Sequence, residues 1–491
     1  MIGFAKLVGF DKKNTTARTE ILAGIVTFLA MAYILTLNPL LMLNISDATQ
    51  EYAHLYPSVF VATALGGFLG TFLMAVYAKL PLAQAPGLGL NSMVGGMLGG
   101  SLIGFSLSFG NAMLLVFLSG VLFLGLSIFK IHGHSIREII YKAIPESIRK
   151  ATSVGIGLFI AIIGLANAGI VGTGEGTVIG LVKLSSWDMA VVGPALVCLF
   201  GFLVIAILSH FKVKGAVIIG IVSATLLGVI PAIGVTEWSG LTWKFWEYFK
   251  GFFSFNSAEG GTFFAAFTEG FRFEAGVPVM SLIMVVITFC MVDMFDTMGT
   301  CVGCCSAAGL MTDDGMPKNY NKIMVADSVA TACGALLGTS TVTTFVESGA
   351  GVSAGGKTGL TSFTTAILFL LSIFLLPIFA SIPLEAASSA LIWVGCLMLK
   401  GAQDIKVDNV KDFVPTFLTI VMMPFAYSIT AGIGFGILSY VLIVFFDYFV
   451  KLIAYACDKK ENKEKPVWNL HVVLLIIAAL FVVYFFVPVS F

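Results

Sequence analysis

Apolar residues fall in long uninterrupted blocks along nearly the whole chain, such as Ile21–Leu43, Ala112–Phe129 and Val472–Val487. A helix needs about 20 apolar residues to cross the hydrocarbon core of a bilayer. Because lipid offers no partners for backbone N–H and C=O groups, blocks of this length predict transmembrane helices. Transmembrane barrels need short alternating strands, and the chain does not show that alternation. The pattern predicts an all-α polytopic membrane protein.

Fourteen spans and one extra apolar stretch are expected from these blocks. Their predicted positions are 21–43, 58–77, 84–104, 112–129, 151–169, 189–209, 215–232, 278–303, 322–340, 342–356, 358–382, 384–400, 412–428 and 430–450, with the extra stretch at 470–488. Short cytoplasmic loops collect Lys and Arg. Basic residues gather before the first span and in the 130–150 loop, so we expect a cytoplasmic N-terminus in the cell membrane.

This topology divides the chain into five parts. They are a cytoplasmic N-terminal segment, a first seven-helix repeat, an extracellular loop, a second seven-helix repeat, and a cytoplasmic linker with a C-terminal apolar segment. Their predicted bounds are 1–20, 21–232, 233–277, 278–450 and 451–491. Whether 470–488 forms a further span stays open.

The two halves are related by an internal repeat. The sequence VATALGGFLGT at residues 61–71 recurs as VATACGALLGT at residues 329–339, with eight of eleven positions identical. Weaker matches in the same order join Val26–Phe28 to Ile287–Phe289, and Ile144–Glu146 to Ile382–Glu385. Seven spans separate equivalent helices, and an odd number turns the second half upside down. Inverted repeats of this kind are typical of secondary transporters.

Two segments in corresponding places of the halves carry helix-breaking residues. Residues 84–91 read QAPGLGLN, and residues 347–356 read ESGAGVSAGG. Proline removes a backbone donor, and glycine lowers the cost of leaving helical geometry. Close helix packing would account for the glycines, but not for Pro86 or for an acid at Glu347. We therefore expect broken helices, with short extended segments, whose half-helix N-termini face a substrate near the midplane.

Acidic residues inside the spans indicate where the solute binds. A charge at membrane depth costs about 2.5–3.5 kcal/mol on the permissive insertion scale. Asp293 and Asp296 share a helix face at i, i+3 spacing, and Glu347 lies at the second break. An acid that can exchange a proton is what proton coupling requires, although each could instead bond the free N–H groups of a broken helix. Asp327 is interpreted as a structural helix-end residue near the cytoplasmic face.

Composition and the remaining motifs exclude other classes of protein. Only 11% of the residues are charged, against roughly a quarter in soluble domains. The 27 basic and 27 acidic residues cancel, and no nucleic-acid partner is expected. Gly351–Thr358 fits the phosphate-loop pattern but lacks the soluble α/β sheet that pattern needs. Cys301, Cys304 and Cys305 have no second cluster or nearby histidine, so packing is favoured over a metal site. No cofactor and no catalytic residue is expected.

At its motifs the sequence resembles the nucleobase–cation symporter-2 superfamily, specifically its adenine–guanine–hypoxanthine permease branch. The motifs follow one another in order over nearly the whole chain. They are Thr15–Glu20 (TTARTE) with Gly24–Phe28 (GIVTF), Ala85–Asn91 (APGLGLN), Phe295–Thr300 (FDTMGT) and Phe345–Gly351 (FVESGAG).

The resemblance implies two inverted repeats of seven spans. Spans 1–4 and 8–11 would form a core domain that slides against a gate domain of spans 5–7 and 12–14, in an elevator-like cycle. It places purine contacts on Asn91, Asp296 and Glu347, gives Asp293 importance, and implies proton symport. The neighbours expected to line the same site are Phe295, Phe345, Val346 and Ser348. A homodimer is a further expectation from the family.

The sequence thus favours a proton-coupled importer of purine nucleobases, with the preferred purine left open. One alternative keeps the fold and carries xanthine, uracil or a small anion. The eighth span lacks the histidine of uracil and xanthine relatives, and acidic motifs disfavour an anion. An integral-membrane enzyme or receptor is the other alternative, and the missing catalytic residues and the repeat speak against it.

Overall fold

The structure is a computed structural model. It describes residues 2–11, 15–44, 51–100, 106–131, 134–174, 177–181, 189–213, 215–230, 245–255, 257–273, 277–312, 316–405, 409–426, 428–457, 468 and 470–486. Within these residues, nine helices are long and apolar enough to cross a membrane. They are Ala17–Met42, Ala53–Ala78, Phe109–Ile128, Glu146–Asn167, Val192–His210, Val279–Ser306, Gly359–Ala380, Leu384–Gln403 and Ala431–Tyr455. The chain is a multi-pass helical membrane protein, as the apolar blocks predict.

The chain forms two compact units. Unit 1 comprises Met1–Ile128, Ile160–Val277 and Val285–Val394, and unit 2 comprises Phe129–Phe159, Pro278–Met284 and Gly395–Phe491. Unit 1 holds α1 (Ile2–Leu7), α2 (Ala17–Met31), α3 (Ile34–Met42), α4 (Tyr56–Leu73), β1 (Gln84–Pro86), α5 (Leu88–Leu98), α6 (Phe109–Ile128), β4 (Val171–Gly174), β5 (Thr177–Leu181), α9 (Met189–His210), α10 (Ala216–Gly228), α11 (Phe245–Phe252), α12 (Ala265–Thr268), α14 (Tyr320–Leu337), β6 (Val342–Thr344), α15 (Ser348–Ser353), α16 (Gly359–Ser372) and α17 (Leu376–Ala380). Unit 2 holds β2 (Lys130–Ile131), β3 (His134–Ser135), α7 (Ile136–Ala143), α19 (Val410–Phe425), α20 (Ile429–Cys457) and α21 (Val472–Phe486). The boundaries between the two units fall within three helices, namely α8 (Glu146–Asn167), α13 (Val279–Ala307) and α18 (Leu384–Met398).

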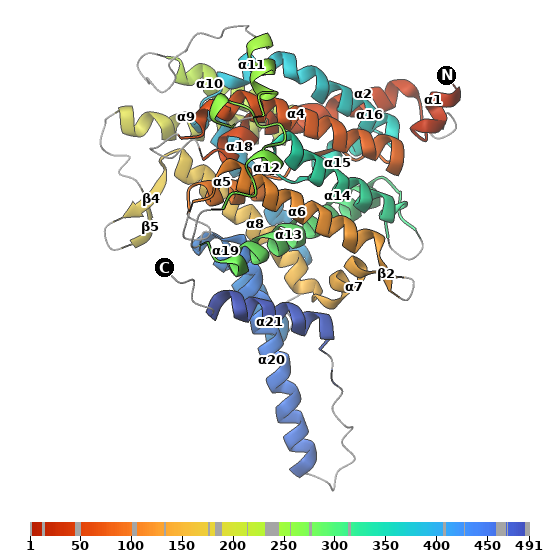
Figure 1. Cartoon of the computed structure of the whole chain (residues 1–491). Coiled ribbons are helices and arrows are strands. Elements are labelled where there is room, and N and C mark those ends of the chain that lie inside the picture. Colours follow the sequence, from red (N-terminus) through yellow and green to blue (C-terminus); the bar gives the residue numbers. More distant parts are fainter. Residues whose placement is uncertain are drawn as a thin grey trace. The chain divides into compact units, whose positions relative to one another are not determined.

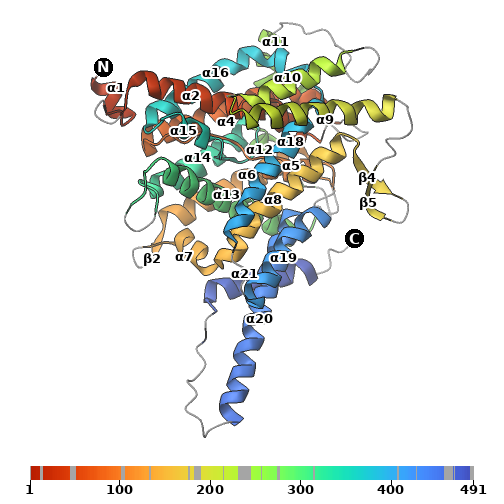
Figure 2. The same cartoon turned by 180° about the vertical axis from the view of Figure 1, so that it is seen from behind.

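The two copies of the repeat lie on helices that pack against each other in unit 1. Residues 61–71 lie on α4 and residues 329–339 on α14 and its C-terminal turn, and Figure 1 shows these helices with α6 beside α14. Their glycines allow close approach, since a Cβ on Gly120 of α6 would stand 2.7 Å from the backbone N of Ala332. α16 packs against α2 and α4, and α9 packs against α10, as Figure 2 shows from behind.

The third and tenth predicted spans are broken, as the proline and glycines predict. In place of continuous helices over 84–104 and 342–356, each has a three-residue strand followed by a short helix, β1–α5 and β6–α15. The strands pair antiparallel, with Gln84 opposite Thr344 and Pro86 opposite Val342. Because Pro86 has no N–H, it cannot continue a helical ladder, and the following Gly87 N–H donates instead to the Thr341 carbonyl at 3.0 Å.

The described part of the long 233–277 loop is folded onto unit 1. α11 packs against α4, and α12 packs against α6. The loop also caps the C-terminus of α14, because Phe264 N donates to Leu336 O at 2.7 Å and Thr262 Oγ1 donates to Leu337 O at 3.1 Å. Its rings contact one another, namely Phe249, Phe252, Phe253, Phe255, Phe263, Phe264, Phe267 and Phe271. Phe252 is fully buried, whereas Phe253, Phe255, Phe264, Phe267 and Phe271 are 37–65% exposed, so the aromatic residues of this loop form a partly exposed cluster.

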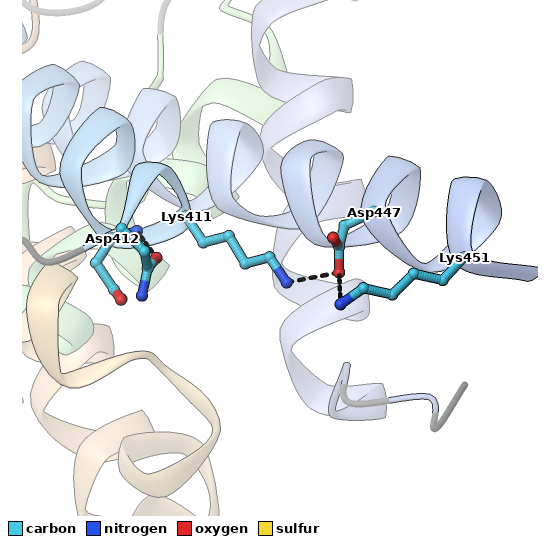
Figure 3. A network of polar contacts seen from close by, with 5 residues as sticks. Lys411, Asp412, Asp447 and Lys451 are labelled. Atoms are coloured by element: carbon cyan, nitrogen blue, oxygen red, sulfur yellow. Dashed lines mark hydrogen bonds and ion pairs between the residues drawn. The ribbon is translucent and has the colours of Figure 1, made fainter. Parts of the chain in front are cut away.

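In unit 2, α19, α20 and α21 are consecutive helices in contact. α20 continues seven residues past the predicted end at 450, to Cys457. Asp447 on α20 accepts from Lys411 of α19 at 2.5 Å and from Lys451 one turn later at 3.0 Å, as Figure 3 shows. The extra apolar stretch is α21, which is 15 residues long and also contacts α7.

Candidate substrate site at the crossing of β1 and β6

The crossing of β1 and β6 is held by bonds beyond the strand pairing. Phe345 N donates to Ala83 O at 3.0 Å, and Ser348 Oγ accepts from Ala83 N at 2.9 Å. α5 begins two residues after the end of β1, and α15 begins four residues after the end of β6. Because the strands are antiparallel, the N-termini of these two helices lie at opposite ends of the strand pair. Asn91 follows one end, and Glu347 follows the other.

A buried polar network supports the strands from α13 and α14. Asp327 Oδ1 accepts from Gln84 Nε2 at 2.6 Å, and Asp327 Oδ2 accepts from Thr297 Oγ1 at 2.8 Å. Thr297 Oγ1 also lies 2.7 Å from Thr343 Oγ1 and accepts from Thr344 N at 3.3 Å. Asp327 is fully buried. Its predicted structural role stands, but it supports the strand crossing and does not lie at a helix end.

Asp293 faces the same network and is also buried. Its Oδ2 accepts from Thr331 Oγ1 of the second repeat copy at 2.8 Å, and that hydroxyl lies 3.2 Å from the Val342 carbonyl. Its Oδ1 has no hydrogen-bond partner among the described residues. One oxygen therefore ties α13 to α14, while the other is buried without a donor, which costs about 1–3 kcal/mol unless a proton, water or ligand satisfies it.

Asp296, one turn further along α13, is partly exposed, and its side chain forms no hydrogen bond within the described part of the chain. The i, i+3 pair on α13 thus divides its roles. Asp293 is hydrogen-bonded to α14, and the Asp296 side chain has no hydrogen-bond partner in the described residues.

Glu347 lies in the turn before α15. Its Oε1 accepts from Tyr33 Oη at 2.5 Å, and its Oε2 is buried without a hydrogen-bond partner in the described residues. The side chain does not cap α15, because the helix N-terminus receives no side-chain bond there. One oxygen of Glu347 therefore remains available as an acceptor.

Asn91 is buried in the first turn of α5. Its Oδ1 accepts from Ser340 Oγ, and its Nδ2 lies at the limit of bonding, 3.5 Å from Pro86 O. The side chain thus links α5 to the turn before β6. Because Oδ1 already accepts a bond, Nδ2 is the end of the side chain that can donate a hydrogen bond to another group.

The four neighbouring residues expected in the site differ in what they expose. Phe295 and Phe345 are each 7% exposed, Val346 is 53% exposed, and Ser348 is fully buried. The Ser348 hydroxyl is hydrogen-bonded to the backbone of Ala83, so this residue stabilises the broken tenth span. The Val346 carbonyl lies 3.8 Å from Cys304 Sγ, which places α13 beside the turn that carries Glu347.

The electrostatics of this region are acidic. None of Asp293, Asp296, Asp327 and Glu347 forms an ion pair with a described residue, and Asp293, Asp327 and Glu347 accept from hydroxyl or amide groups. Within the described residues, no group of three or more His, Cys, Asp or Glu side chains could hold a metal ion. Asp293 Oδ1 and Glu347 Oε2, which have no hydrogen-bond partner in the described residues, can accept further N–H or O–H donors.

Sequence reasoning missed three residues that the structure connects to this region. Tyr33 lies between α2 and α3, Gln84 begins the first break, and Glu20 ends the TTARTE motif. The available signal was weak: Glu20 and Gln84 are polar side chains at the border of an apolar block, and Tyr33 lies inside one. Their partners are hundreds of residues away, so spacing alone could not reveal them.

Glu20 also explains the phosphate-loop pattern. Its carboxylate accepts from the backbone N–H groups of Lys357 and Thr358 at 3.1 and 3.2 Å, and from the Thr361 hydroxyl at 2.6 Å. In a nucleotide-binding loop such N–H groups would hold phosphate. Here a buried carboxylate of the same chain occupies them and caps α16.

Comparison with known proteins agrees with the fold and the motifs. Residues 18–435 match a family described as the Permease family, of the nucleobase–cation symporters. The guanine/hypoxanthine permease PbuG of Bacillus subtilis is 33% identical over 479 residues, which cover 95% of this chain and 97% of that protein. The adenine permease AdeQ of Escherichia coli is 34% identical over 439 residues, which cover 89% and 90%.

Among solved structures, the transmembrane domain of the cyanobacterial bicarbonate transporter BicA shares the fold. The TM-score is 0.57 at 17% identity, and the match covers 84% of this chain and 97% of that domain. Such neighbours have two inverted repeats of seven segments, the architecture that the repeat at 61–71 and 329–339 predicts. The chain therefore belongs to the permease family of nucleobase–cation symporters, in the branch whose curated members are named adenine and guanine/hypoxanthine permeases.

Proposed function

We propose that this protein is a secondary transporter that imports purine nucleobases, with Asn91, Asp296 and Glu347 as its substrate contacts. The observation that carries the proposal is the pair of acids at the crossing, Glu347 with one bare buried oxygen and Asp296 with no hydrogen bond in the described chain. The relatives named guanine/hypoxanthine and adenine permeases support the same solute class.

The chemistry of purines matches these groups. A purine is planar and largely neutral at pH 7, and it presents N–H donors beside ring acceptors. Glu347 Oε2 can accept one N–H, and Asn91 Nδ2 can donate to a ring acceptor. Phe295 or Phe345 can cover the ring face. A solute that leaves the bare carboxylate oxygen unpaired would lose about 1–3 kcal/mol, which gives the site its selectivity.

The coupling and the cycle form the second part of the proposal. Proton symport needs a group that exchanges a proton while the solute is bound, and Asp296 is the acid free of the scaffold. In an elevator cycle, the spans that carry the crossing would move as one body against the gate spans. The bonds of Asp327 and Asp293 support this, because together with the Thr331 hydroxyl they join β1, β6, α13 and α14 to one another. A cytoplasmic N-terminus and a homodimer complete the proposal.

A small anion is the alternative solute on this fold, as the name of BicA illustrates. An anion would need cationic groups at the crossing, and the described residues place acids there without an ion pair. The anion alternative is therefore less well supported than a neutral ring.

The proposal is tested by uptake of radiolabelled adenine, guanine, hypoxanthine, xanthine and uracil into cells that express the protein. We expect uptake of at least one purine well above cells with an empty vector, and stimulation by an inward proton gradient. Absence of purine uptake, with the protein present in the membrane, would refute the substrate. Purine uptake that is unaffected by a protonophore would refute proton coupling alone.

A further inference from the structure

Tyr33 is the residue from the first repeat that contacts the proposed substrate acid of the second repeat. It is 1% exposed, and Glu347 is its hydrogen-bond partner within the described part of the chain. A buried tyrosine hydroxyl needs a partner. Here the partner is a carboxylate oxygen that would otherwise be available to a solute.

Both ends of this contact are held in place. The Tyr33 carbonyl accepts from Thr36 N at 3.2 Å and from Leu37 N at 3.1 Å, which starts α3. On the other side, Ser348 is bonded to Ala83. A bond between two fixed segments is already ordered before a solute arrives, so it costs little to keep.

The contact leaves the two oxygens of Glu347 unequal. Oε1 is occupied by the hydroxyl, and Oε2 is bare and buried. A free carboxylate can accept two parallel N–H bonds from one ligand edge. We propose that Tyr33 is a specificity-determining residue: its hydroxyl takes one lone pair of Oε1 and its ring blocks the approach of a second donor, so that Glu347 offers Oε2 alone to the purine edge.

This inference rests on the proposed purine transport and adds a consequence for selectivity. Guanine and hypoxanthine share the N1–H donor and the O6 acceptor, and guanine adds a 2-amino group beside N1. With one oxygen available, the 2-amino group gains no bond to Glu347. The affinities of the protein for guanine and hypoxanthine should therefore lie within about threefold of each other. A charge-assisted hydrogen bond to the 2-amino group would produce a larger difference.

The decisive variant is Tyr33→Phe, which removes only the hydroxyl and frees Oε1. We expect the preference for guanine over hypoxanthine to rise about tenfold, the order of one hydrogen bond to a charged acceptor. The measurement is competition by each unlabelled base against uptake of labelled hypoxanthine. The ratio of the two inhibition constants does not depend on the amount of protein in the membrane.

Tyr56→Phe is the matched control. Its hydroxyl donates to the Phe379 carbonyl at 3.3 Å, so the variant also loses a tyrosine hydroxyl bond, but not one to Glu347. It should leave the guanine-to-hypoxanthine ratio unchanged. A merely structural role of Tyr33 would weaken both bases equally and also leave the ratio unchanged, which would overturn the inference.

The wild-type protein provides a second measurement that needs no variant. A preference for guanine above about tenfold would show that the 2-amino group already finds an acceptor, and would also overturn the inference. If the wild-type protein takes up no purine, the proposed function fails and this inference falls with it. If the wild-type protein takes up purines but Tyr33→Phe leaves the guanine-to-hypoxanthine ratio unchanged, the proposed function stands and only the role of Tyr33 is refuted.

Discussion

Gln84 and Asp327 lie 243 positions apart in the chain, and the Gln84 amide donates to the Asp327 carboxylate across 2.6 Å. The bond joins the strand of the first broken span to the helix that carries the second repeat copy. Thr297 donates to the other oxygen of the same carboxylate at 2.8 Å. One buried acid thus connects three segments that hold the crossing in shape.

Replacing that acid should destabilise the protein. Asp327→Ala leaves the Gln84 amide and the Thr297 hydroxyl without their acceptor, at about 1–3 kcal/mol for each buried donor. We expect a clear fall in the melting temperature of the detergent-purified protein and loss of uptake, with Asp327→Asn milder because one acceptor oxygen remains. Asp447→Ala is the comparison, because its bonds to Lys411 and Lys451 are partly exposed and pairs of that kind contribute about 0–1 kcal/mol. Equal melting temperatures for the two alanine variants would contradict the role of Asp327.

Neutralising Glu347 should remove purine binding while sparing the fold. In Glu347→Gln the amide oxygen can still accept from Tyr33, so the protein should remain folded. The loss of a charged acceptor for a purine N–H should raise the KM for purine at least about tenfold. Uptake kinetics across purine concentrations measure this, and Glu259→Gln, at an exposed loop position, controls for expression. If Glu347→Gln has the KM of the wild-type protein, Glu347 does not bind the purine.

Glu20 should contribute to stability through the cap that it forms on α16. Glu20→Ala leaves the backbone N–H groups of Lys357 and Thr358 without their acceptor. We expect the free energy of unfolding to fall by about 2 kcal/mol or more. Thermal unfolding followed by size-exclusion chromatography measures this. Glu146→Ala is the control, because its ion pair with Lys150 is exposed and should contribute about 0–1 kcal/mol. Identical thermal curves for Glu20→Ala and wild type would show that the cap is dispensable.

Gly351 should not tolerate a side chain. A Cβ at this position would stand 2.0 Å from Thr27 Oγ1 and 2.8 Å from the Ala23 carbonyl, so Gly351→Ala must push α15 away from α2. We expect uptake to fall at least about tenfold, because displacements of about 1 Å in a positioned site cost that much or more. Gly251→Ala is the comparison, since a Cβ there meets nothing within 4 Å. Uptake by Gly351→Ala at the level of Gly251→Ala would refute the close packing.

The broken spans were predictable because their cause is local. Pro86 lacks a donor, and the glycines of residues 347–356 lower the cost of an extended backbone. Asp293, Asp296 and Glu347 were recognisable for a similar reason, since an acid inside an apolar block carries a cost that function must justify. The different duties of Asp293 and Asp296 were not predictable, because they depend on the hydroxyl of Thr331, which α14 brings to one acid and not to the other.

By itself, the sequence determined that the chain is a helical membrane protein with inverted halves, two breaks and an acidic centre. Hydrophobic length, backbone chemistry and repeat spacing are properties of neighbouring residues, so they can be read along the chain. Only the tertiary structure decided that Tyr33 bonds Glu347, that Asp327 supports the strand crossing, and that Glu20 caps α16. Each of these is a directional bond of about 3 Å between segments hundreds of residues apart, and such a bond exists only once packing has set the distance and the angle.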